Sequence, residues 1–361
     1  MQKAKHNCFL FTDALGAGGA QRQLVGLARL LKLNGQEVKI VTYHEGSFYG
    51  DILRESGIEH EVVSKTSNKF KRILIVAKYF KRKNTDIVIA YQASPSIIAC
   101  ISKLLGGKYK LIVSERNTNQ RYTKADRLRF LLYRWADYIV PNSYSQADFV
   151  SRHAPWLKDK LKVIVNFVDT NFFVPGEQKM KKDVLIILSI GRMTPQKNIL
   201  TYIEAINILV NQGIRLRVDW YGYADQGGVY YQKCLEKISE YKLTKFFFFH
   251  EPSKEVVNLY QQADAFCLPS IYEGTPNVLC EAMSCGLPVI CSDVCDNSRY
   301  VKNNGLLCNP QSVQSIVDAI TQFVGMNEEQ IKEMSLRSRE LAIANFSSES
   351  FIKQYLYLLY E

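Results

Sequence analysis

The stretch AFCLPSIYEGTPNVLCEAMSCGLPVICSD, residues 265–293, decides the fold class of this chain. An apolar run (265–270) leads into a loop, a helix-length segment (277–285) ends at a glycine, and a second apolar run (287–293) follows. A strand, a helix and a strand in this order form a parallel βαβ unit. Continuous apolar runs are typical of parallel strands that are covered on both faces. The stretch therefore predicts an open α/β sheet with a ligand-binding loop after its first strand.

The same alternation of apolar runs and helix-length segments extends along the chain in two series. The first series begins at CFLFTDA (8–14), and the second begins at VLIILSIGR (184–192). Between them, FFVPGEQKMKKD (172–183) is polar and contains Pro and Gly, as domain linkers do. We therefore expect two Rossmann-like, doubly wound α/β domains, joined near residues 170–183, that face each other across a cleft.

The composition is that of a folded globular protein. The chain has 361 residues, 47% of them apolar, and nine scattered cysteines, which is typical of a folded protein with reduced thiols that pack as small apolar side chains. No apolar run is long enough to cross a bilayer, and the N-terminal stretch predicts a buried strand instead of a signal peptide. We therefore expect a cytoplasmic protein.

Charge is distributed unevenly. The net charge is +11, but residues 1–172 hold 28 Lys and Arg against 14 Asp and Glu, whereas the remainder hold 18 against 21. The first half is thus expected to meet an anionic partner. A nucleic acid is not favoured, because the sequence shows neither an aromatic sheet surface nor a recognition helix.

Two glutamates, Glu273 and Glu281, flank the loop-to-helix junction of the opening stretch. The first turn of a helix exposes N–H groups that bind anions, and Glu281 lies about one turn further on. A carboxylate, a row of backbone donors and a second carboxylate suit the hydroxyls and the pyrophosphate of a sugar nucleotide. The spacing alone also fits two unrelated surface residues.

The longer string PS-x-x-EG-x-PN-x-x-x-EAM-x-CG-x-PVI (269–290) resembles the motif of the large retaining glycosyltransferase family numbered four, which has the GT-B fold. GAGGAQRQLVGLARLL (16–31), VIVNFVDTNFF (163–173) and SIGRMTPQKNI (189–199) resemble the family in the same order. The tail NFSSESFIKQYLYLLY (345–360) resembles the family's last helix, which packs back on the first domain. The resemblance implies an acceptor-side domain 1–172, a nucleotide-sugar-binding domain 173–345 and a closing helix 346–361.

The resemblance also implies roles for individual residues. Arg192 and Lys197 match the pair that neutralises the donor pyrophosphate, and fixed cations stabilise the charge that develops on a leaving diphosphate. Glu281 matches the residue that binds the ribose, and Glu273 matches the one near the transferred sugar; the catalytic set is Glu273, Arg192 and Lys197. The implied donor is a UDP- or GDP-linked sugar. Neither a metal nor another cofactor is expected, because the sequence contains no Asp-x-Asp pair suited to Mg²⁺ or Mn²⁺.

Other positions follow from the same resemblance, with alternatives that stay open. The implied donor-binding set is Gly18, Gly19, Gly191, Arg192, Lys197, His250, Glu273, Gly274, Thr275, Pro276, Asn277, Val278 and Glu281. Taken alone, the glycines at 16–19 fit a tight turn equally well, and His250 also fits a loop residue that acts only through its backbone. On the acceptor side, Arg116 and Asn117 stand where many relatives have a histidine; Arg116 fits either an acceptor phosphate or a neighbouring acid.

KFKRILIVAKYFKRK (69–83) holds seven basic residues and no acid, and RYTKADRLRFLLYRW (121–135) adds five more. Apolar residues in the first segment follow helical spacing, at Phe70, Ile73, Leu74, Ala77 and Phe80. Such a helix either docks its apolar face on the sheet or lies on an anionic membrane surface.

The sequence thus predicts a retaining, metal-independent hexosyltransferase of GT-B fold. Its expected acceptor is a hydroxyl of a lipid-linked glycan in cell-surface polysaccharide synthesis, reached as a peripheral protein at the inner face of the cytoplasmic membrane. One alternative is a nucleotide-sugar epimerase of the same fold, which needs the donor pocket but no basic acceptor surface. Another is a non-catalytic protein that binds sugar nucleotides or membranes, which has no need of the four residues Arg192, Lys197, Glu273 and Glu281.

Overall fold

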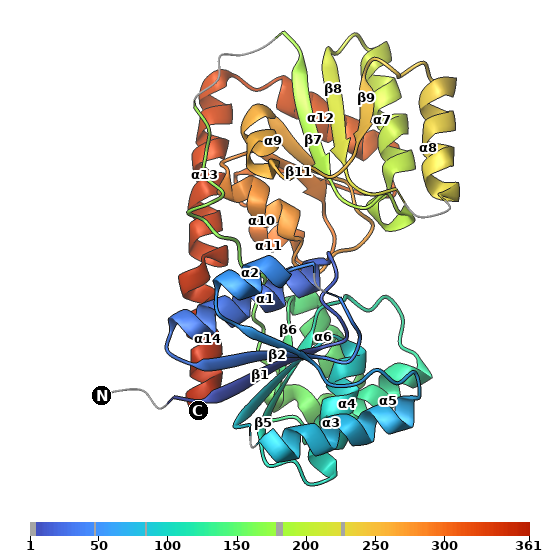
Figure 1. Ribbon diagram of the computed structural model, residues 1–361. Coiled ribbons are helices and arrows are strands. Elements are labelled where there is room, and N and C mark those ends of the chain that lie inside the picture. The colour runs from blue at the N-terminus through green and yellow to red at the C-terminus, as the bar shows by residue number, and fades with distance from the viewer. Residues whose placement is uncertain (1–4, 47, 84, 178–182, 225–227) are drawn as a thin grey trace. The chain divides into compact units, whose positions relative to one another are not determined.

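The computed structural model describes residues 5–46, 48–83, 85–177, 183–224 and 228–361. Contacts divide the chain into two compact units. The first consists of Met1–Asn166 and Ser348–Glu361, and the second of Phe167–Ser347 (Figure 1).

The first unit is built on a six-stranded parallel sheet in the order β3-β2-β1-β4-β5-β6. Its strands are β1 (Asn7–Thr12), β2 (Glu37–Thr42), β3 (Glu59–Val62), β4 (Ile87–Tyr91), β5 (Lys110–Glu115) and β6 (Tyr138–Pro141). This is the doubly wound Rossmann order, in which the chain direction across the sheet reverses between β1 and β4. The central strand β4 is buried along its whole length, as its continuous apolar sequence predicts.

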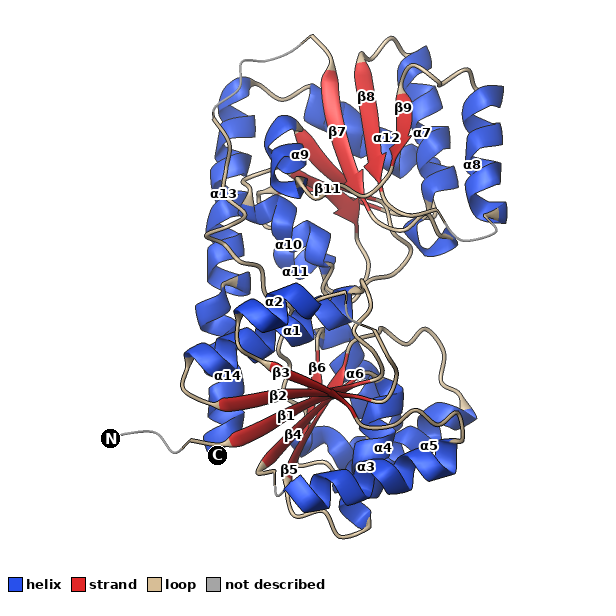
Figure 2. Cartoon of the chain, in the orientation of Figure 1, coloured by secondary structure: helices blue, strands red, loops and turns tan. Residues whose placement is uncertain are grey.

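Helices cover both faces of the first sheet (Figure 2). They are α1 (Gly19–Leu33), α2 (Gly50–Glu55), α3 (Lys69–Lys83), α4 (Ala93–Leu104), α5 (Lys124–Leu132), α6 (Tyr144–His153) and α14 (Ser348–Tyr360), with 3₁₀ turns η1 (Tyr133–Trp135) and η2 (Pro155–Lys160). One core joins the sheet to α3, α4, α5 and α6 around Phe9, Phe11, Phe80 and Phe130. On the other face α14 packs against α1, which confirms the predicted return of the last helix to the first domain.

The second unit repeats the topology. Its six parallel strands run in the order β12-β11-β10-β7-β8-β9. They are β7 (Leu185–Ile190), β8 (Leu216–Tyr221), β9 (Phe247–His250), β10 (Ala265–Leu268), β11 (Val289–Ser292) and β12 (Gly305–Cys308). The reversal point lies between β7 and β10, which pair in parallel. The predicted fold class, two doubly wound α/β units, is therefore confirmed.

The helices of the second unit also lie on both faces of its sheet. They are η3 (Pro195–Lys197), α7 (Ile199–Asn211), α8 (Val229–Glu240), α9 (Val256–Gln262), α10 (Asn277–Ser284), α11 (Asn297–Tyr300), α12 (Val313–Val324) and α13 (Glu328–Phe346). One core binds α7, α8 and α12 to the sheet around the fully buried Trp220. On the other side α9 contacts β7, and α10 contacts both β10 and α13.

The boundary between the units lies after Asn166, six residues before the predicted position. Residues 167–172 are held by the second unit instead of the first. The Val168 N–H donates to the Phe346 carbonyl at 2.8 Å, and the Arg339 guanidinium donates to the Thr170 and Phe173 carbonyls at 2.8 and 2.7 Å. These bonds fasten the segment to α13. Of the predicted link (172–183), residues 178–182 lie outside the described part of the chain.

Arg116, which the resemblance placed on the acceptor side, holds a structural position in the first unit. Its side chain is buried, and it donates to Ser114 Oγ (2.7 Å), Asn166 Oδ1 (3.0 Å) and the hydroxyls of Tyr91 (2.9 Å) and Tyr355 (2.6 Å). Burial raises the pKa of Tyr91 well above its usual value, so this phenol stays neutral. Arg116 thereby fastens α14 to the ends of β4 and β5, and within the described residues it bonds to hydroxyls and an amide instead of an acid. Its contact with an acceptor phosphate stays a prediction.

The apolar side of α3 also differs from the expected stripe. Val76 and Phe80 are buried in the core, but Phe70 and Leu74 are 82% and 61% exposed. The helix is rotated so that the inward line follows Ile73, Val76 and Phe80, at helical spacing. Phe70 and Leu74 therefore share the outer face with the lysines.

All nine cysteines are free thiols, and eight of them are buried. Burial raises the pKa of the Cys234 thiol to about 12, so it stays protonated at neutral pH. The cysteines thus pack as small apolar groups, as predicted. In the described part of the chain, helices fall short of the length and apolar character that a membrane crossing requires.

We expect Arg116→Ala to lower the free energy of unfolding by about 2 kcal/mol or more, because buried hydroxyl and amide groups lose their donor. Arg116→Lys should recover only part of this, since an ammonium lacks the planar fork of donors. Urea unfolding measures both. Arg121→Ala, at an exposed position of the following loop, is the matched control and should stay within about 0.5 kcal/mol. An unchanged midpoint for Arg116→Ala would contradict the structural role.

Candidate active site

The candidate site lies at the carboxyl ends of β7 and β10 in the second unit. These strands are neighbours at the point where the strand order reverses. In open α/β sheets the loops that leave the strands at such a point diverge and form a ligand-binding crevice. Lys197 follows β7, and Glu273 follows β10. The topology therefore brings together two residues that are 76 positions apart in the sequence.

The two loops are fastened to each other by three bonds. The Ile271 N–H donates to the Gln196 carbonyl at 2.9 Å, and the Gln196 side-chain amide donates to the Tyr272 carbonyl at 2.9 Å. Beside them, Lys197 Nζ contacts Glu273 Oε1 at 2.5 Å, and the two side chains are only 14% and 9% exposed. Shielding from water strengthens this ion pair relative to a surface pair. Lys197 and Glu273 are therefore fixed at the carboxyl ends of the two central strands.

The turn that precedes Lys197 depends on a close backbone contact. Trp220 Nε1 donates to the Gly191 carbonyl at 2.9 Å, and the Gly191 N–H donates to the Tyr221 carbonyl at 2.9 Å. A side chain at Gly222 would place its Cβ 2.0 Å from the same Gly191 oxygen, so only glycine fits there. Both polar backbone groups of Gly191 are thus used within the protein. Arg192, the next residue, is exposed, and among the described residues its guanidinium has no partner.

The helix α10 begins at Asn277, directly after Pro276, and its first turn is the positive end of the helix dipole. The loop before it is largely enclosed: Thr275 is 4% exposed and its hydroxyl lies 3.4 Å from that of Tyr300. Gly274 and Val278 stand on either side of this junction. The predicted donor-binding stretch 273–278 therefore forms one loop-to-helix junction beside Lys197.

Glu281 lies in the middle of α10 and is only 1% exposed. The Tyr260 hydroxyl, from α9, donates to Glu281 Oε2 at 2.9 Å. A buried carboxylate needs such donors, because burial without them is costly. Glu273 and Glu281 thus occupy different environments: the first is paired with a cation, and the second is held by a phenol deeper in the unit.

His250 ends β9, and its side chain is held in place. Nε2 lies 2.6 Å from Asp219 Oδ1, and the ring stacks on Tyr221 with centroids 4.4 Å apart. Arg217 binds the same Asp219 carboxylate through two bonds of 2.8 Å. The His250 carbonyl accepts the Gly222 N–H at 3.0 Å. His250 is therefore part of an ordered polar row along β8 and β9 instead of a plain loop residue.

In the first unit, the glycines at 16–19 form the turn between β1 and α1. The Gly18 N–H donates to the Gly16 carbonyl at 2.8 Å, Gly18 caps α1, and Gly19 is its first residue. None of the three adopts a left-handed backbone. The turn lies at the carboxyl end of β1, which is the reversal point of the first sheet. A tight turn is thus present, and a phosphate contact stays a prediction.

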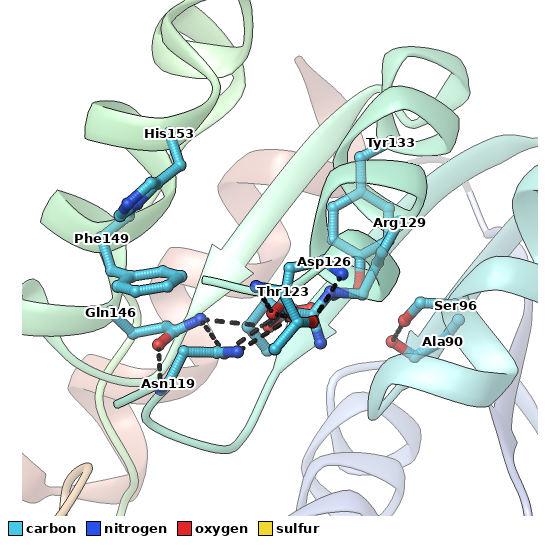
Figure 3. A network of polar contacts seen from close by, with 11 residues as sticks. Ala90, Ser96, Asn119, Thr123, Asp126, Arg129, Tyr133, Gln146, Phe149 and His153 are labelled. Carbon is cyan, nitrogen blue, oxygen red and sulfur yellow. Dashed lines mark hydrogen bonds and ion pairs between the residues drawn. The ribbon is translucent and has the colours of Figure 1, made fainter. Parts of the chain in front are cut away.

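Asn117 is exposed in the loop after β5, and this loop is anchored by a buried polar network (Figure 3). The Asn119 N–H and side chain bond to Gln146 at 2.8 and 2.9 Å, and the Asn119 amide donates to Asp126 Oδ1 at 3.0 Å. Asp126 pairs with Arg129 at 2.9 Å, and both side chains are about nine-tenths buried. The loop 117–123 is therefore presented from a rigid base.

Sequence reasoning missed three of the residues that hold the site. Gln196 stands beside Lys197 in the quoted motif and offered a local signal. Tyr260 and Asp219 contact Glu281 and His250 across 21 and 31 positions, and no local pattern indicates such contacts.

Comparisons with known proteins agree with this fold. The family model described as Glycosyltransferase Family 4 matches residues 17–172, and that described as Glycosyl transferases group 1 matches residues 172–340. The chain is 25% identical over 355 residues to the GalNAc-alpha-(1->4)-GalNAc-alpha-(1->3)-diNAcBac-PP-undecaprenol alpha-1,4-N-acetyl-D-galactosaminyltransferase of Campylobacter jejuni, with 93% of this chain and 94% of that protein covered. It is 23% identical over 296 residues to the UDP-Gal:alpha-D-GlcNAc-diphosphoundecaprenol alpha-1,3-galactosyltransferase of Escherichia coli, with 77% and 76% covered.

Among solved structures, Anabaena Alr3699/HepE in complex with UDP superposes with a TM-score of 0.87 at 18% identity, and 98% of this chain and 99% of that chain are covered. At this identity the likeness shows the fold alone. Taken together, the fold is of the GT-B type, and the chain belongs to the group 1 glycosyltransferase family. It is a glycosyltransferase.

Proposed function

We propose that this glycosyltransferase moves a hexose from a UDP- or GDP-linked donor to a glycan hydroxyl, with retention of the anomeric configuration and without a metal. The observation that carries the proposal is the Lys197–Glu273 contact of 2.5 Å at the reversal point of the second sheet. A cation fixed there suits a leaving diphosphate, and a carboxylate beside it suits the sugar at the reacting carbon.

Lys197 and Arg192 are the proposed partners of the diphosphate. A lysine ammonium has three N–H donors, and the bond to Glu273 uses one of them. The others are available to phosphate oxygens, so Lys197 is able to join the sugar side and the phosphate side of the site. Arg192 is exposed two residues after β7 and adds a second cation with several donors.

The first turn of α10 and the two glutamates complete the proposed donor site. The N–H groups of Asn277 and Val278 lie in the first turn of α10, at the positive end of the helix dipole, which favours phosphate. Glu281 is assigned to the ribose hydroxyls and Glu273 to a hydroxyl of the transferred sugar. Glu273 also favours positive charge as it develops at the anomeric carbon.

In the proposed reaction the acceptor hydroxyl attacks from the same side as the leaving diphosphate. The bond from the anomeric carbon to the phosphate oxygen breaks, the bond to the acceptor oxygen forms, and the departing phosphate takes the acceptor proton. This route needs no enzyme nucleophile, which agrees with the pairing of the Glu273 carboxylate to Lys197. Retention follows because both bonds lie on one face of the sugar.

The proposed acceptor is a glycan on a lipid diphosphate, used in cell-surface polysaccharide synthesis at the cytoplasmic face of the membrane. Support comes from the names of the two relatives above, which act on undecaprenol diphosphate-linked glycans. The Erwinia amylovora protein AmsD of amylovoran biosynthesis, 24% identical over 345 residues, agrees with this class. An epimerase would need no acceptor surface, and a non-catalytic protein would not need the fixed ion pair.

We also propose that the outer faces of α3 and α5 meet an anionic membrane. Exposed charges on these two helices are all positive: Lys69, Lys71, Lys78, Lys81, Arg82, Lys83, Lys124 and Arg127. The one acid, Asp126, is turned inward and paired with Arg129 (Figure 3). Large apolar residues, Phe70, Leu74 and Leu128, are 82%, 61% and 59% exposed among these cations. Basic faces with exposed apolar residues suit the headgroup region of a bilayer.

For the diphosphate role, Lys197→Ala should lower turnover by about a hundredfold or more, because a preorganised charge contact is lost. Turnover is measured with a panel of UDP- and GDP-linked hexoses and N-acetylhexosaminyl diphosphoundecaprenol in detergent. Lys332→Ala, at an exposed site on α13, removes the same charge elsewhere and should keep wild-type turnover. Transfer should also persist in EDTA. A strict requirement for a divalent metal would contradict the metal-free mechanism.

For the glutamates, Glu281→Ala should weaken nucleoside diphosphate binding about tenfold, because the ribose is held alike in the ground and transition states. Glu273→Ala should mainly lower turnover. Tyr260→Phe is the matched control for burial, because it removes the bond to Glu281 but keeps the carboxylate. Nucleoside diphosphate binding should therefore weaken much less in Tyr260→Phe than in Glu281→Ala. Calorimetric titration measures the affinity for the nucleoside diphosphate, and the melting temperature shows whether each variant is still folded. Wild-type affinity in a folded Glu281→Ala protein would show that the ribose assignment is wrong.

For the membrane, the wild-type protein should sediment with anionic vesicles at low salt, and binding should weaken steeply as salt shortens the Debye length to about 10 Å at 0.1 M. Changing Lys78, Lys81, Arg82 and Lys83 to Gln should abolish most binding, as should Phe70→Gln with Leu74→Gln. The control changes four exposed lysines of the second unit to Gln: Lys233, Lys245, Lys302 and Lys332. If the wild type ignores anionic vesicles at low salt, a soluble acceptor becomes the better proposal.

A further inference from the structure

Gln92 has the most unusual backbone in the first unit. Its φ and ψ are 73° and 166°, in a region that is essentially reserved for glycine. Asn198 also has a positive φ, of 59°, but its ψ of 36° places it in the left-handed helical region that asparagine tolerates. The Gln92 conformation is locked, because its N–H donates to the Ser114 carbonyl at 3.0 Å and its carbonyl accepts the Ser96 N–H at 3.1 Å. Strained residues of this kind gather at functional sites.

The position of Gln92 in the sheet also indicates a ligand site. It directly follows β4, which neighbours β1 at the reversal point of the first sheet. Because the two units share one topology, this is the counterpart of the loop after β10 that carries Glu273. A ligand of the first unit is expected at this point. The nucleotide is proposed to bind the second unit, so the first unit's reversal point suits the other substrate.

The side chain of Gln92 is half-buried and has hydrogen-bonding capacity to spare. Thr12 Oγ1 lies 3.5 Å from Gln92 Oε1 and 3.2 Å from Asp13 Oδ1. A hydroxyl carries one proton, so Thr12 donates to only one of them, and the shorter bond is to Asp13. In the described part of the chain the Gln92 amide nitrogen makes no further bond. A carboxamide both donates and accepts, as does a sugar hydroxyl.

We infer that Gln92 recognises a hydroxyl of the acceptor glycan and that its strained backbone aims the carboxamide at this substrate. The inference rests on the proposed function and deepens it, because it names an acceptor-recognising residue in the first unit. Glycine would adopt the same backbone without strain, so a function of the side chain explains why a glutamine stands at this position.

Two variants separate recognition from folding. Gln92→Met keeps the length of the side chain and the strain but removes both polar groups, and Gln92→Gly removes the side chain together with the strain. Both should raise the acceptor KM about tenfold, the effect of one lost hydrogen bond to a substrate hydroxyl. Gln92→Gly should melt at or above the wild-type temperature. Calorimetric titration of UDP and GDP should give the wild-type Kd in both variants. Ser94→Ala, at the exposed neighbouring turn, is the control and should keep the wild-type acceptor KM.

A wild-type acceptor KM in both variants would overturn the inference while leaving the proposed function intact. A Gln92→Gly protein that melts well below the wild type would also overturn it, because the glutamine would then serve packing. By contrast, a wild-type protein that binds no nucleoside diphosphate and transfers no sugar would remove the proposed function itself.

Discussion

The contact between Lys197 and Glu273 is the constraint on which the site depends. The two residues belong to loops 76 positions apart, and they meet because β7 and β10 are neighbours at the reversal point of a parallel sheet. The Gln196 bonds to Ile271 and Tyr272 hold the loops in one register. Without that register, a cation and a carboxylate would be two mobile surface side chains with little mutual energy.

Two arginines with neutral or backbone partners, one buried and one half-buried, hold other parts of the chain in order. Arg116 joins β4, β5 and α14 through hydroxyls and an amide, and Arg339 joins α10 and α13 to the segment before them. Arginine suits this task because its planar fork offers five donors that stay charged. In each unit the polar interior therefore fixes the path of the chain, while the apolar cores of the two sheets supply the bulk of the stability.

Periodicity predicted the central strands, the two-unit division and the helix at 69–83, because these features are written in local apolar patterns. It did not indicate the edge strands β3 and β12, which are four residues long and partly exposed. The roles of Arg116 and Tyr355 were out of reach, since they meet across 239 positions. The outward placement of Phe70 and Leu74 depends on how α3 is rotated against the sheet, and basic and apolar residues share that face. Lys197 and Glu273 were predicted from the resemblance to the glycosyltransferase family, and the structure adds that they touch.

A crystal structure of the protein with UDP or GDP would show directly whether Lys197 binds the donor diphosphate. We predict that the diphosphate lies at the carboxyl ends of β7 and β10, with Lys197 Nζ within hydrogen-bonding distance, about 3 Å, of a phosphate oxygen. The ribose hydroxyls should then lie on the side of Glu281. A nucleotide bound elsewhere, with Lys197 in contact with Glu273 alone, would contradict this prediction.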